Sequence, residues 1–271
     1  MERQIINGQN LSPKSNYLKK VPIMKRFKNK IVVLTGAGSG IGRSTALRLD
    51  SEGADLLIID KNQEDLDTTK NMLKNKNSSA HVVDISSIAS TANFFKDLER
   101  DFKRLDALIN IAGILRFDNS HEVELENWNQ ILEINLTGTF FMCRHALPLL
   151  LKSKGAIVNV SSTAALGAHA WTAAYSASKG GISAFSKTLA VEYGMKGLNI
   201  NCVCPASIET PMSSNPVMPK GIDTRLLKKI MPLDGVNRSP DDIASTIAFL
   251  ASDDAIHING IDLRVDGGLL T

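Results

Sequence analysis

A tyrosine and a lysine four residues apart are the first groups in this sequence whose spacing suggests chemistry. On a helix, Tyr175 and Lys179 share one face, so the phenol and the ammonium approach the same small volume. A free phenol has a pKa of about 10, and a neighbouring cation lowers it toward the value that a general acid/base needs. Such a pair is common by chance on helix surfaces. Ser162, 13 residues earlier at the end of an apolar run, supports the catalytic interpretation.

A glycine cluster is the second candidate site. Thr35–Gly42 follows a short β-branched run and places Gly36, Gly40 and Gly42 in a GxxxGxG spacing. Glycines at a strand-to-helix turn allow the backbone to approach a pyrophosphate and direct helix amides at its negative charge. They also suit a turn that is structural only, so the cluster alone leaves both readings open.

Asp60 favours the nucleotide interpretation. It ends the next apolar run, 18 residues after Gly42, where a carboxylate can accept hydrogen bonds from both hydroxyls of an adenosine ribose. The same charge repels a 2′-phosphate, so it favours NAD over NADP. Lys61 beside it softens that preference, and an ordinary surface acid is the alternative reading of Asp60.

These groups need a scaffold, and apolar runs alternate with helical stretches from residue 30 onward. Strands are expected at 31–34, 55–60, 81–84, 106–110, 156–160, 199–203 and 262–265, and helices to about 52, to about 75, around 94–102, over 124–152 and over 173–193. Continuous apolar strands separated by helices predict an α/β fold with a parallel sheet covered on both faces. Ser162 then lies at the carboxyl end of the sheet, where ligands bind.

Segment 205–238 is the one long irregular stretch, and it holds five of the nine prolines. A loop of this length in a compact domain is usually a lid or a binding loop. A short helix is expected at 222–230, and the next helix should begin at Ser239, which is followed by a proline and two acids. Apolar side chains such as Met212, Val217 and Leu226 suggest an apolar substrate lid.

The composition of the chain excludes several classes of protein. With 271 residues, 43% apolar and 22% charged, the chain has enough apolar material for one sizeable core. No run approaches the roughly 18 apolar residues of a membrane span. Three cysteines cannot form a disulfide framework, and Cys202 and Cys204 lack the spacing of a metal site. We therefore expect a cytoplasmic, metal-free protein.

The positive charge is concentrated at the amino end. Residues 1–30 carry a net +7 and the other 241 a net −4, so the basic pI is poor evidence for a nucleic-acid surface on the body. We expect a basic extension at 1–28 and a single domain at 29–271. The extension lacks the continuous apolar stretch that a secretory signal peptide contains. A mitochondrial presequence, a partly ordered surface extension, and an arm that binds nucleic acid or acidic lipid all stay open.

Several motifs together resemble one family. They are Thr35–Gly42, Asn110–Gly113, Asn135, Ser162, Tyr175-Ser-Ala-Ser-Lys179, Pro205 to Thr210 and Val265–Gly268. In order and spacing they resemble the short-chain dehydrogenase/reductase superfamily over about residues 28–268. The resemblance implies a Rossmann-type, doubly wound, seven-stranded parallel sheet flanked by helices.

The resemblance also implies roles. Tyr175 would exchange a proton with the substrate oxygen, Ser162 would hold that oxygen, Lys179 would bind the nicotinamide ribose and lower the pKa of Tyr175, and Asn135 would support a proton-relaying water. The implied NAD-binding residues are Gly36, Ser39, Gly40, Ile41, Gly42, Asp60, Asp84, Ile85, Asn110, Ala112, Gly113, Tyr175, Lys179, Pro205, Ile208 and Thr210.

Two positions depart from the family pattern. Ile111 replaces a usual asparagine, and Ala206 replaces a usual glycine after Pro205. Because alanine disfavours positive φ, the backbone over the nicotinamide is expected to differ from the family pattern. His169 and Trp171 lie between Ser162 and Tyr175, and His169 is expected to be a pocket-wall or surface histidine rather than a second acid or base.

We therefore expect an NAD(H)-dependent oxidoreductase that interconverts a secondary alcohol and a ketone. An NADPH-dependent 3-oxoacyl-carrier-protein reductase is the alternative within the class, and Asp60 weighs against it. A catalytically silent nucleotide-binding scaffold is the alternative outside it. The expected partners are a small-molecule substrate and further copies of the chain in a homotetramer or homodimer, with no nucleic acid and no membrane span.

Overall fold

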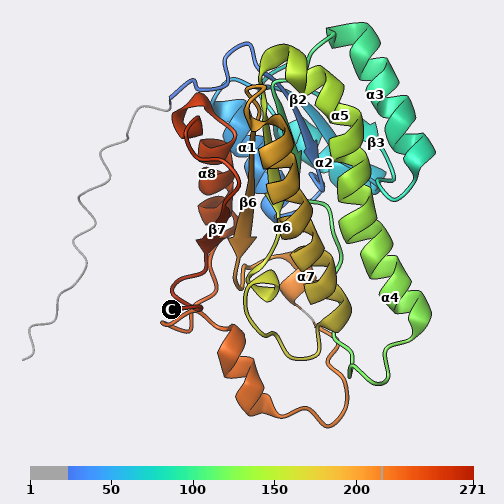
Figure 1. Cartoon of the computed structure of the whole chain (residues 1–271), viewed down its shortest axis with the longest axis vertical. Coiled ribbons are helices and arrows are strands. Elements are labelled where there is room, and N and C mark those ends of the chain that lie inside the picture. Colours follow the sequence, from blue (N-terminus) through green and yellow to red (C-terminus); the bar gives the residue numbers. More distant parts are fainter. Residues whose placement is uncertain (1–23, 215) are drawn as a thin grey trace, which may run out of the picture.

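The fold is a three-layer arrangement around one twisted sheet (Figure 1). The structure is a computed structural model that describes residues 24–214 and 216–271, so most of the expected basic extension lies outside the described residues. The strands are β1 (Ile31–Thr35), β2 (Asp55–Asp60), β3 (Ser79–Val82), β4 (Ala107–Asn110), β5 (Ala156–Val160), β6 (Asn199–Pro205) and β7 (Asp262–Val265). They form one seven-stranded sheet in the order β3-β2-β1-β4-β5-β6-β7, and every neighbouring pair is parallel. The expected parallel α/β fold is confirmed.

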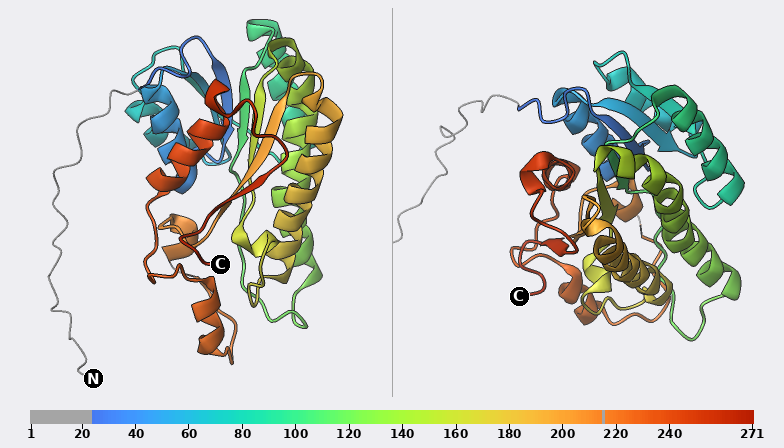
Figure 2. Two further views of the ribbon diagram at one scale, coloured as in Figure 1. Left: turned by 60° about the vertical axis from the view of Figure 1, so that its left-hand side comes forward. Right: turned by 45° about the horizontal axis from the view of Figure 1, so that its top comes forward.

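Helices cover both faces of the sheet, as the two turned views show (Figure 2). The α-helices are α1 (Gly40–Ser51), α2 (Gln63–Met72), α3 (Ile88–Phe102), α4 (Leu125–Ile131), α5 (Thr139–Ser153), α6 (Ala173–Gly194), α7 (Pro211–Ser214) and α8 (Pro240–Leu250). Shorter or tighter segments are the π-helical η1 (Leu132–Gly138) and the 3₁₀ turns η2 (Thr163–Ala165), η3 (Thr224–Ile230) and η4 (Asp253–Ala255). Helices α1, α2 and α8 pack on one face, and α3, α5 and α6 on the other.

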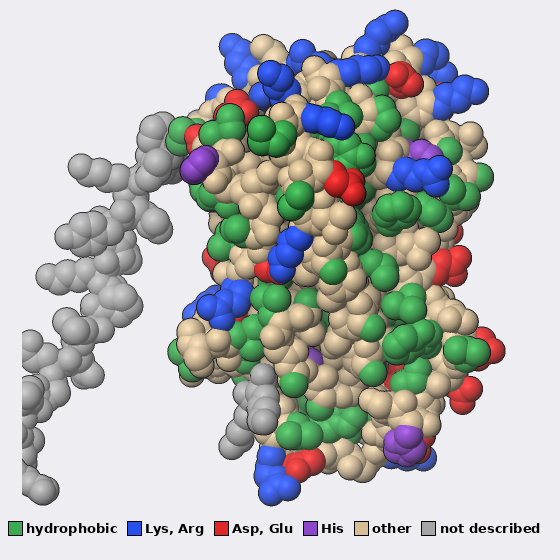
Figure 3. Space-filling view, in the orientation of Figure 1, with side chains coloured by type: hydrophobic (Ala, Val, Ile, Leu, Met, Phe, Trp, Pro, Cys, Tyr) green, Lys and Arg blue, Asp and Glu red, His purple; other side chains and the backbone are tan. Residues whose placement is uncertain are grey.

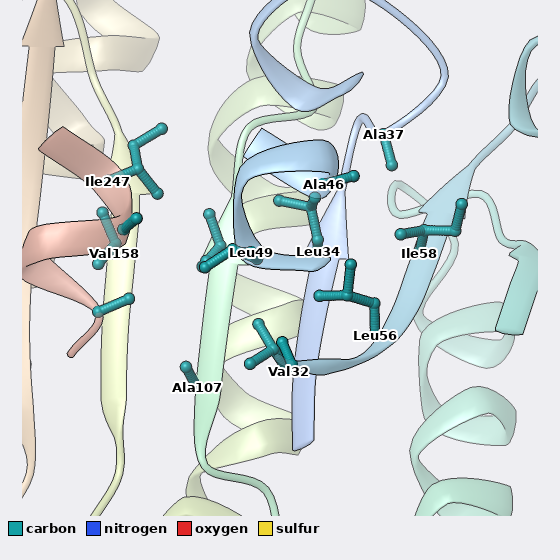
Figure 4. Packing of buried hydrophobic residues seen from close by; sticks show 14 of the residues in the cluster. Val32, Leu34, Ala37, Ala46, Leu49, Leu56, Ile58, Ala107, Val158 and Ile247 are labelled. Atoms are coloured by element: carbon teal, nitrogen blue, oxygen red, sulfur yellow. The ribbon is translucent and has the colours of Figure 1, made fainter. Parts of the chain in front are cut away.

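The apolar runs are continuous because each central strand is buried on both sides. In β1, Val32 and Leu34 belong to the core under α1 and α8, while Val33 between them belongs to the core under α3 and α5. Figure 4 shows the first of these cores, where Leu49 of α1 and Ile247 of α8 meet the strands. Side chains alternate along a strand, so a strand between two helical layers needs apolar residues at every position.

The strand order creates the place where a ligand can bind. β1 pairs with β2 on one side and with β4 on the other, so the chain returns from the β3 edge to continue beside β1. Helical connections leave in opposite directions at this point, and a crevice opens beyond the carboxyl ends of the two strands. In Figure 1 these ends point down, toward segment 205–238.

Two expected elements differ from the structure. The third strand is Ser79–Val82 rather than 81–84, because its register against β2 pairs Ser79 with Leu57 and Val82 with Asp60. The single helix expected over 124–152 is a continuous helical run that contains the π-helical turn η1 between α4 and α5. A π-helical turn has one extra residue, and hydrophobic periodicity over one turn does not reveal it.

Segment 205–238 has its two ends joined to each other. Ile208 and Arg238 form an isolated parallel bridge, and Glu209 N donates to Arg238 O at 2.9 Å. The helical turn expected at 222–230 is the 3₁₀ turn η3. The expected start of α8 is confirmed, since the Ser239 side chain accepts from Asp241 N and Pro240 opens the helix.

Residues 24–28 pack against the body, and Arg26 carries that contact. Its guanidinium binds both carboxylate oxygens of Glu52, at 2.6 and 2.8 Å, and also reaches Asp254. Burial raises the pKa of Glu52, but the hydrogen bonds from Arg26 and Arg48 outweigh it and leave that pKa lowered. Phe27 is buried in the core beside α1 and α8.

Basic side chains collect at the end of the molecule away from the crevice, along the upper edge in Figure 3. Helices α1, α2, α3 and α5 each have a basic residue in the last turn, namely Arg48, Lys70, Arg100 and Lys152. Cations there offset the negative end of the helix dipole. Of the helices in the described part of the chain, none is long and apolar enough to cross a membrane.

The contact of Arg26 with Glu52 predicts a pH-dependent stability. Arg26→Met should lower the free energy of unfolding by about 1–3 kcal/mol at pH 7, because a buried carboxylate loses a charged hydrogen-bond partner. The folded-state pKa of Glu52 is lowered, so its contribution is present above the unfolded pKa and is lost as pH falls through the folded one. Urea titrations at pH 7 and pH 4 should show the difference narrowing in acid.

Arg100→Met is the matched control, because among the described residues Arg100 pairs only with exposed acids on its own helix. It should change the stability little at either pH. An Arg26→Met protein as stable as the parent at pH 7 would contradict this account of the amino-terminal contact.

Candidate active site

A cavity of about 670 Å³ lies at the carboxyl edge of the sheet. Of the residues expected at the site, those that line it are Gly36, Ser39, Gly40, Ile41, Gly42, Asp60, Asp84, Ile85, Ala112, Gly113, Ser162, Tyr175, Lys179, Pro205, Ile208 and Thr210. Asn110 and Asn135 are buried behind its wall. The fold therefore brings the glycine turn and the tyrosine–lysine pair, more than 130 residues apart in sequence, to one cavity.

The turn after β1 needs glycine for two reasons. Gly36 has a φ of +70°, and a Cβ there would lie 2.7 Å from Ala112 N. The neighbouring Thr35 hydroxyl accepts from Ile111 N at 3.1 Å and from Ala112 N at 3.3 Å. Any larger side chain at position 36 would push the turn away from the end of β4. Close contact between these two strand ends forms the floor of the cavity.

The first turn of α1 fits an anionic group. Ser39 is the N-cap residue, yet within the described structure its side chain makes no capping hydrogen bond, and the first turn contains no acidic residue. Ser39, Gly40 and Ile41 all line the cavity. Uncapped amides at a helix N-terminus, together with the helix dipole, favour a phosphate. The residues present thus fit the pyrophosphate of a dinucleotide.

The Asp60 carboxylate is held in place at the end of β2. Oδ2 accepts from Gly38 N at 2.9 Å, and Oδ1 accepts from Asn62 N at 3.1 Å. Each carboxylate oxygen retains further acceptor capacity for a hydroxyl. Lys61 is exposed and also lines the cavity. The arrangement fits ribose hydroxyls and sets a negative charge where a 2′-phosphate would lie.

Lys179 is anchored by the sheet. The residue is 4% exposed, and its ammonium donates to Val160 O at 2.8 Å and lies 5.7 Å from the centre of the Tyr175 ring. The backbone of the same residue is held as well, since Ser161 Oγ donates to Lys179 O at 2.9 Å. Both contacts join α6 to the end of β5. Tyr175, one turn earlier on α6, is thereby fixed at the cavity wall.

Burial dominates the acid–base behaviour of this pair. It lowers the pKa of Lys179 to about 8 and raises the pKa of Tyr175, and a hydrogen bond with Ser162 opposes the rise. The sequence predicted the opposite direction for Tyr175, through the nearby ammonium. The difference arises because both groups are desolvated and the ammonium donates to the Val160 carbonyl. In this state the phenol is protonated at neutral pH.

Asn135 holds a loop. Its Oδ1 accepts from Ile114 N at 2.8 Å, while Nδ2 donates to Ile114 O at 2.9 Å and to Ser178 Oγ at 3.1 Å. It lies in the π-helical η1, and its own carbonyl accepts from Thr139 Oγ1 at 2.6 Å. Gly113 makes this packing possible, since a Cβ there would lie 3.1 Å from Asn135 Oδ1 and 3.6 Å from Lys179 Nζ.

Asn110 supports the site from behind. Its Nδ2 donates to Asn159 Oδ1 at 2.8 Å, and Asn159 Nδ2 donates to Ser186 Oγ at 2.8 Å. Both bonds are buried, and they link β4, β5 and α6. The structure therefore places Asn110 among supporting residues.

The sequence assigned no role to some residues around the site. Ser178 lies inside the motif that ends at Lys179 and supports Asn135, but a serine beside a lysine in a helix reads as an ordinary polar position. Phe117, Gln130 and Glu133 line the cavity from the stretch between β4 and η1, which lacks a motif. From segment 205–238, Met212 lines the cavity, whereas Val217 is 86% exposed.

The two departures from the family pattern are accommodated. Ile111 packs against the core under α1 and α8, and its amide is bound by Thr35. Ala206 does not have a positive φ, so it needs no glycine. Cys202 and Cys204 are buried with raised pKa values of about 12 and about 11, mainly because of burial. The described residues contain no cluster of side chains suited to a metal ion.

Comparison with a family model covers almost the whole domain. Residues 36–270 match the model described as Enoyl-(Acyl carrier protein) reductase. The match begins at Gly36 and runs through the tyrosine–lysine pair to the carboxyl end.

Named relatives match over similar lengths. Meso-2,3-butanediol dehydrogenase of Serratia marcescens is 35% identical, over 90% of this chain and 95% of its own. The 3beta-hydroxysteroid dehydrogenase of Mediterraneibacter gnavus is 34% identical, over 92% and 98%. The crystal structure of carveol dehydrogenase from Mycobacterium avium in complex with NAD aligns with a TM-score of 0.81 at 28% identity, over 90% of this chain and 99% of its own.

The lowered pKa of Lys179 predicts a stabilising substitution in the protein without added nucleotide. Below pH 8 the folded state must hold a buried ammonium, whereas the unfolded lysine keeps its proton up to about pH 10.5. Lys179→Met should therefore gain stability relative to the parent at pH 7, and the gain should shrink between pH 8 and pH 10.5.

Urea unfolding of both proteins at pH 7 and pH 9.5 measures this difference. Cys143 has no coupling to Lys179 and cancels in the comparison. Cys204, whose pKa the Lys179 charge lowers, still has a pKa of about 11, and that of Cys202 is about 12, so at pH 9.5 these buried thiols stay protonated in the folded parent. A gain that is independent of pH would show that the ammonium is not desolvated as described.

Proposed function

The chain belongs to the short-chain dehydrogenase/reductase family, and from that membership we propose that it interconverts a secondary alcohol and a ketone with NAD(H), with Tyr175 as the proton-exchanging group. It is an oxidoreductase that acts on CH–OH groups. The observation that supports the finer proposal most strongly is the shared cavity. Asp60 and the glycine turn line one part of it, and Ser162, Tyr175 and Lys179 line another.

The division of labour follows from the contacts. Bound NAD(H) supplies the hydride acceptor or donor. The α1 amino terminus would hold the pyrophosphate and Asp60 the adenosine ribose, while Lys179, next to Gly113, would bind the nicotinamide ribose. Apolar side chains such as Phe117, Met212 and Ile230 also line the cavity, so a bound substrate would be partly removed from water.

The proton step involves the phenol and its neighbours. Tyr175 has a raised pKa, so its hydroxyl is protonated and is suited to donate to a ketone oxygen during reduction. In oxidation the phenolate accepts the alcohol proton, and the Lys179 ammonium stabilises that negative charge. Ser162 Oγ accepts from Ala164 N at 3.1 Å and uses its own proton to hold the reacting oxygen. Asn135 would support the water that returns protons to solvent.

The cofactor alternative is an NADPH-dependent 3-oxoacyl-carrier-protein reductase. Asp60 opposes a 2′-phosphate, and Lys61 beside it is the feature that favours one. A silent nucleotide-binding scaffold remains the alternative outside enzymes. Retention of Ser162, Tyr175 and Lys179 in one cavity argues for catalysis.

The organisation around the domain is part of the same proposal. Residues 29–271 would form the catalytic domain with 205–238 as the substrate lid, and 1–28 an extension. We propose a cytoplasmic homotetramer or homodimer. Phe140 on α5 and Val191 on α6 are exposed apolar side chains on the helices that would pair with another copy.

Tyr175→Phe tests the mechanism. The substitution keeps the ring and removes the only group assigned to exchange the proton, so kcat should fall at least about 100-fold. NADH affinity should change little, because the hydroxyl is remote from the adenosine part of the cavity. Tyr193→Phe on the same helix is the control and should keep full activity. Near-native turnover by a folded Tyr175→Phe protein on any alcohol that the parent oxidises would refute the assignment.

Asp60→Ser tests the choice of cofactor. The parent should prefer NAD(H) over NADP(H) by at least tenfold in kcat/KM, about 1.4 kcal/mol, and the substitution should reduce that ratio by about tenfold or more. Asp67→Ser, at an exposed position of α2, should leave the ratio unchanged. Equal use of both cofactors by the parent would overturn the NAD proposal.

A further inference from the structure

Unpaired buried polar atoms indicate where a ligand can bind. Four side-chain atoms in the described residues are buried without a hydrogen-bond partner: Asn110 Oδ1, His145 Nε2, His169 Nε2 and Asp262 Oδ1. Of these four residues, His169 is the one that lines the cavity of Tyr175 and Lys179. Buried polar groups are nearly always hydrogen-bonded. A partner for His169 Nε2 can therefore come from the contents of that cavity.

His169 also lines a second cavity, of about 400 Å³. Small residues form much of that wall, among them Gly167, Ala170 and Ala173, and Leu226 of η3 contributes from segment 205–238. His169 is thus shared by the wall of the cavity of the reacting groups and the wall of this second cavity. A molecule that passes His169 would place its remainder against small and apolar side chains.

The loop that carries His169 is held rigidly. Thr172 Oγ1 donates to His169 O at 2.9 Å, and Asp118 N donates to Trp171 O at 2.9 Å. Trp171 has a φ of +64°, which is rare for a bulky residue. Such backbone strain persists where the surroundings impose it, and it is concentrated at ligand sites.

The chemistry of the imidazole limits the partner. Burial lowers the pKa of His169, so the ring is neutral at pH 7. In a neutral imidazole Nε2 is either a donor or an acceptor, according to the tautomer. A substrate hydroxyl can pair with Nε2 in either tautomer, and a substrate carbonyl can accept from Nε2–H in the tautomer that carries the proton there. A neutral oxygen group therefore fits this position better than a carboxylate or a phosphate.

We propose that His169 binds a second oxygen of the substrate through Nε2, so that the chain acts on secondary alcohols that carry another hydroxyl or carbonyl group. The carbon skeleton beyond the reacting carbon would extend past His169 into the second cavity. This inference rests on the proposed function and narrows its substrate class. His169 acts in it as a specificity-determining residue, and Tyr175 remains the acid/base.

Paired substrates test the inference. The holoenzyme with NAD is assayed by NADH absorbance on 2,3-butanediol against 2-butanol and on 2,5-hexanediol against 2-hexanol, which vary the distance between the oxygens. The variants are His169→Phe, which keeps a ring without a hydrogen bond, and His169→Gln, which keeps a donor and an acceptor. His121→Phe is the control, because His121 is an exposed histidine outside both cavities.

The parent should prefer the diol by at least about tenfold in kcat/KM in one pair or both. His169→Phe should lower kcat/KM on that diol about tenfold and leave the mono-alcohol within about threefold, because only the diol leaves an unpaired group. His169→Gln should recover part of the loss, and His121→Phe should change nothing.

Equal losses of His169→Phe on diol and mono-alcohol would overturn the inference and assign His169 a structural role. An unchanged kcat/KM of His169→Phe on both substrates would also overturn the inference, because it would mean that water, and not the substrate, pairs with Nε2. If the parent oxidises none of the four alcohols but turns over another secondary alcohol, the inference fails for short diols, while the proposed function is judged separately by the Tyr175→Phe test on that other alcohol. Turnover that Tyr175→Phe abolishes, with the diol preference unaffected by His169→Phe, refutes the inference alone.

Discussion

The buried ammonium of Lys179 is the interaction on which the arrangement of the reacting groups depends. It donates to Val160 O at the end of β5, and this contact holds α6 against the carboxyl edge of the sheet. Tyr175 is one helical turn away, so its position follows from the same anchor. Burying a charge is costly, and the cost appears in the lowered pKa of the lysine. Binding a negatively charged dinucleotide next to this ammonium would offset part of that free-energy cost.

A layer of buried amides and hydroxyls supports that anchor. The side-chain amide of Asn135 binds the backbone N–H and the backbone carbonyl of Ile114. Asn110 is joined through Asn159 to Ser186 on α6. These bonds cross between the sheet, η1 and α6, so the elements that form the cavity cannot move independently. Buried hydrogen bonds of this kind favour one packing arrangement. The one polar atom of the layer without a partner among the described residues is Asn110 Oδ1.

The two parts of the cavity differ in how they are built. The part with Asp60 and Gly36 rests on strand ends and a helix start, which are rigid and recur wherever the fold recurs. The part with Tyr175 is bounded by loops, including Phe117 and segment 205–238. Loops tolerate change while the scaffold stays the same. This fits relatives that share about a third of the sequence but are named for substrates as different as butanediol and a steroid.

By itself the sequence determined the parallel α/β fold, the glycine turn and the tyrosine–lysine pair, because continuous apolar runs, glycines at a turn and helical spacing are local properties of a sequence. It did not determine the π-helical turn at Asn135, since an extra residue in one turn leaves no periodic signal. The sequence also did not determine the direction in which the Tyr175 pKa shifts, because residue spacing shows the neighbouring cation but not the desolvation of the phenol. Only the tertiary structure decided that Asn110 lies behind the cavity and that His169 lines two cavities. Those facts depend on how distant segments pack, and no residue pattern within one segment carries that information.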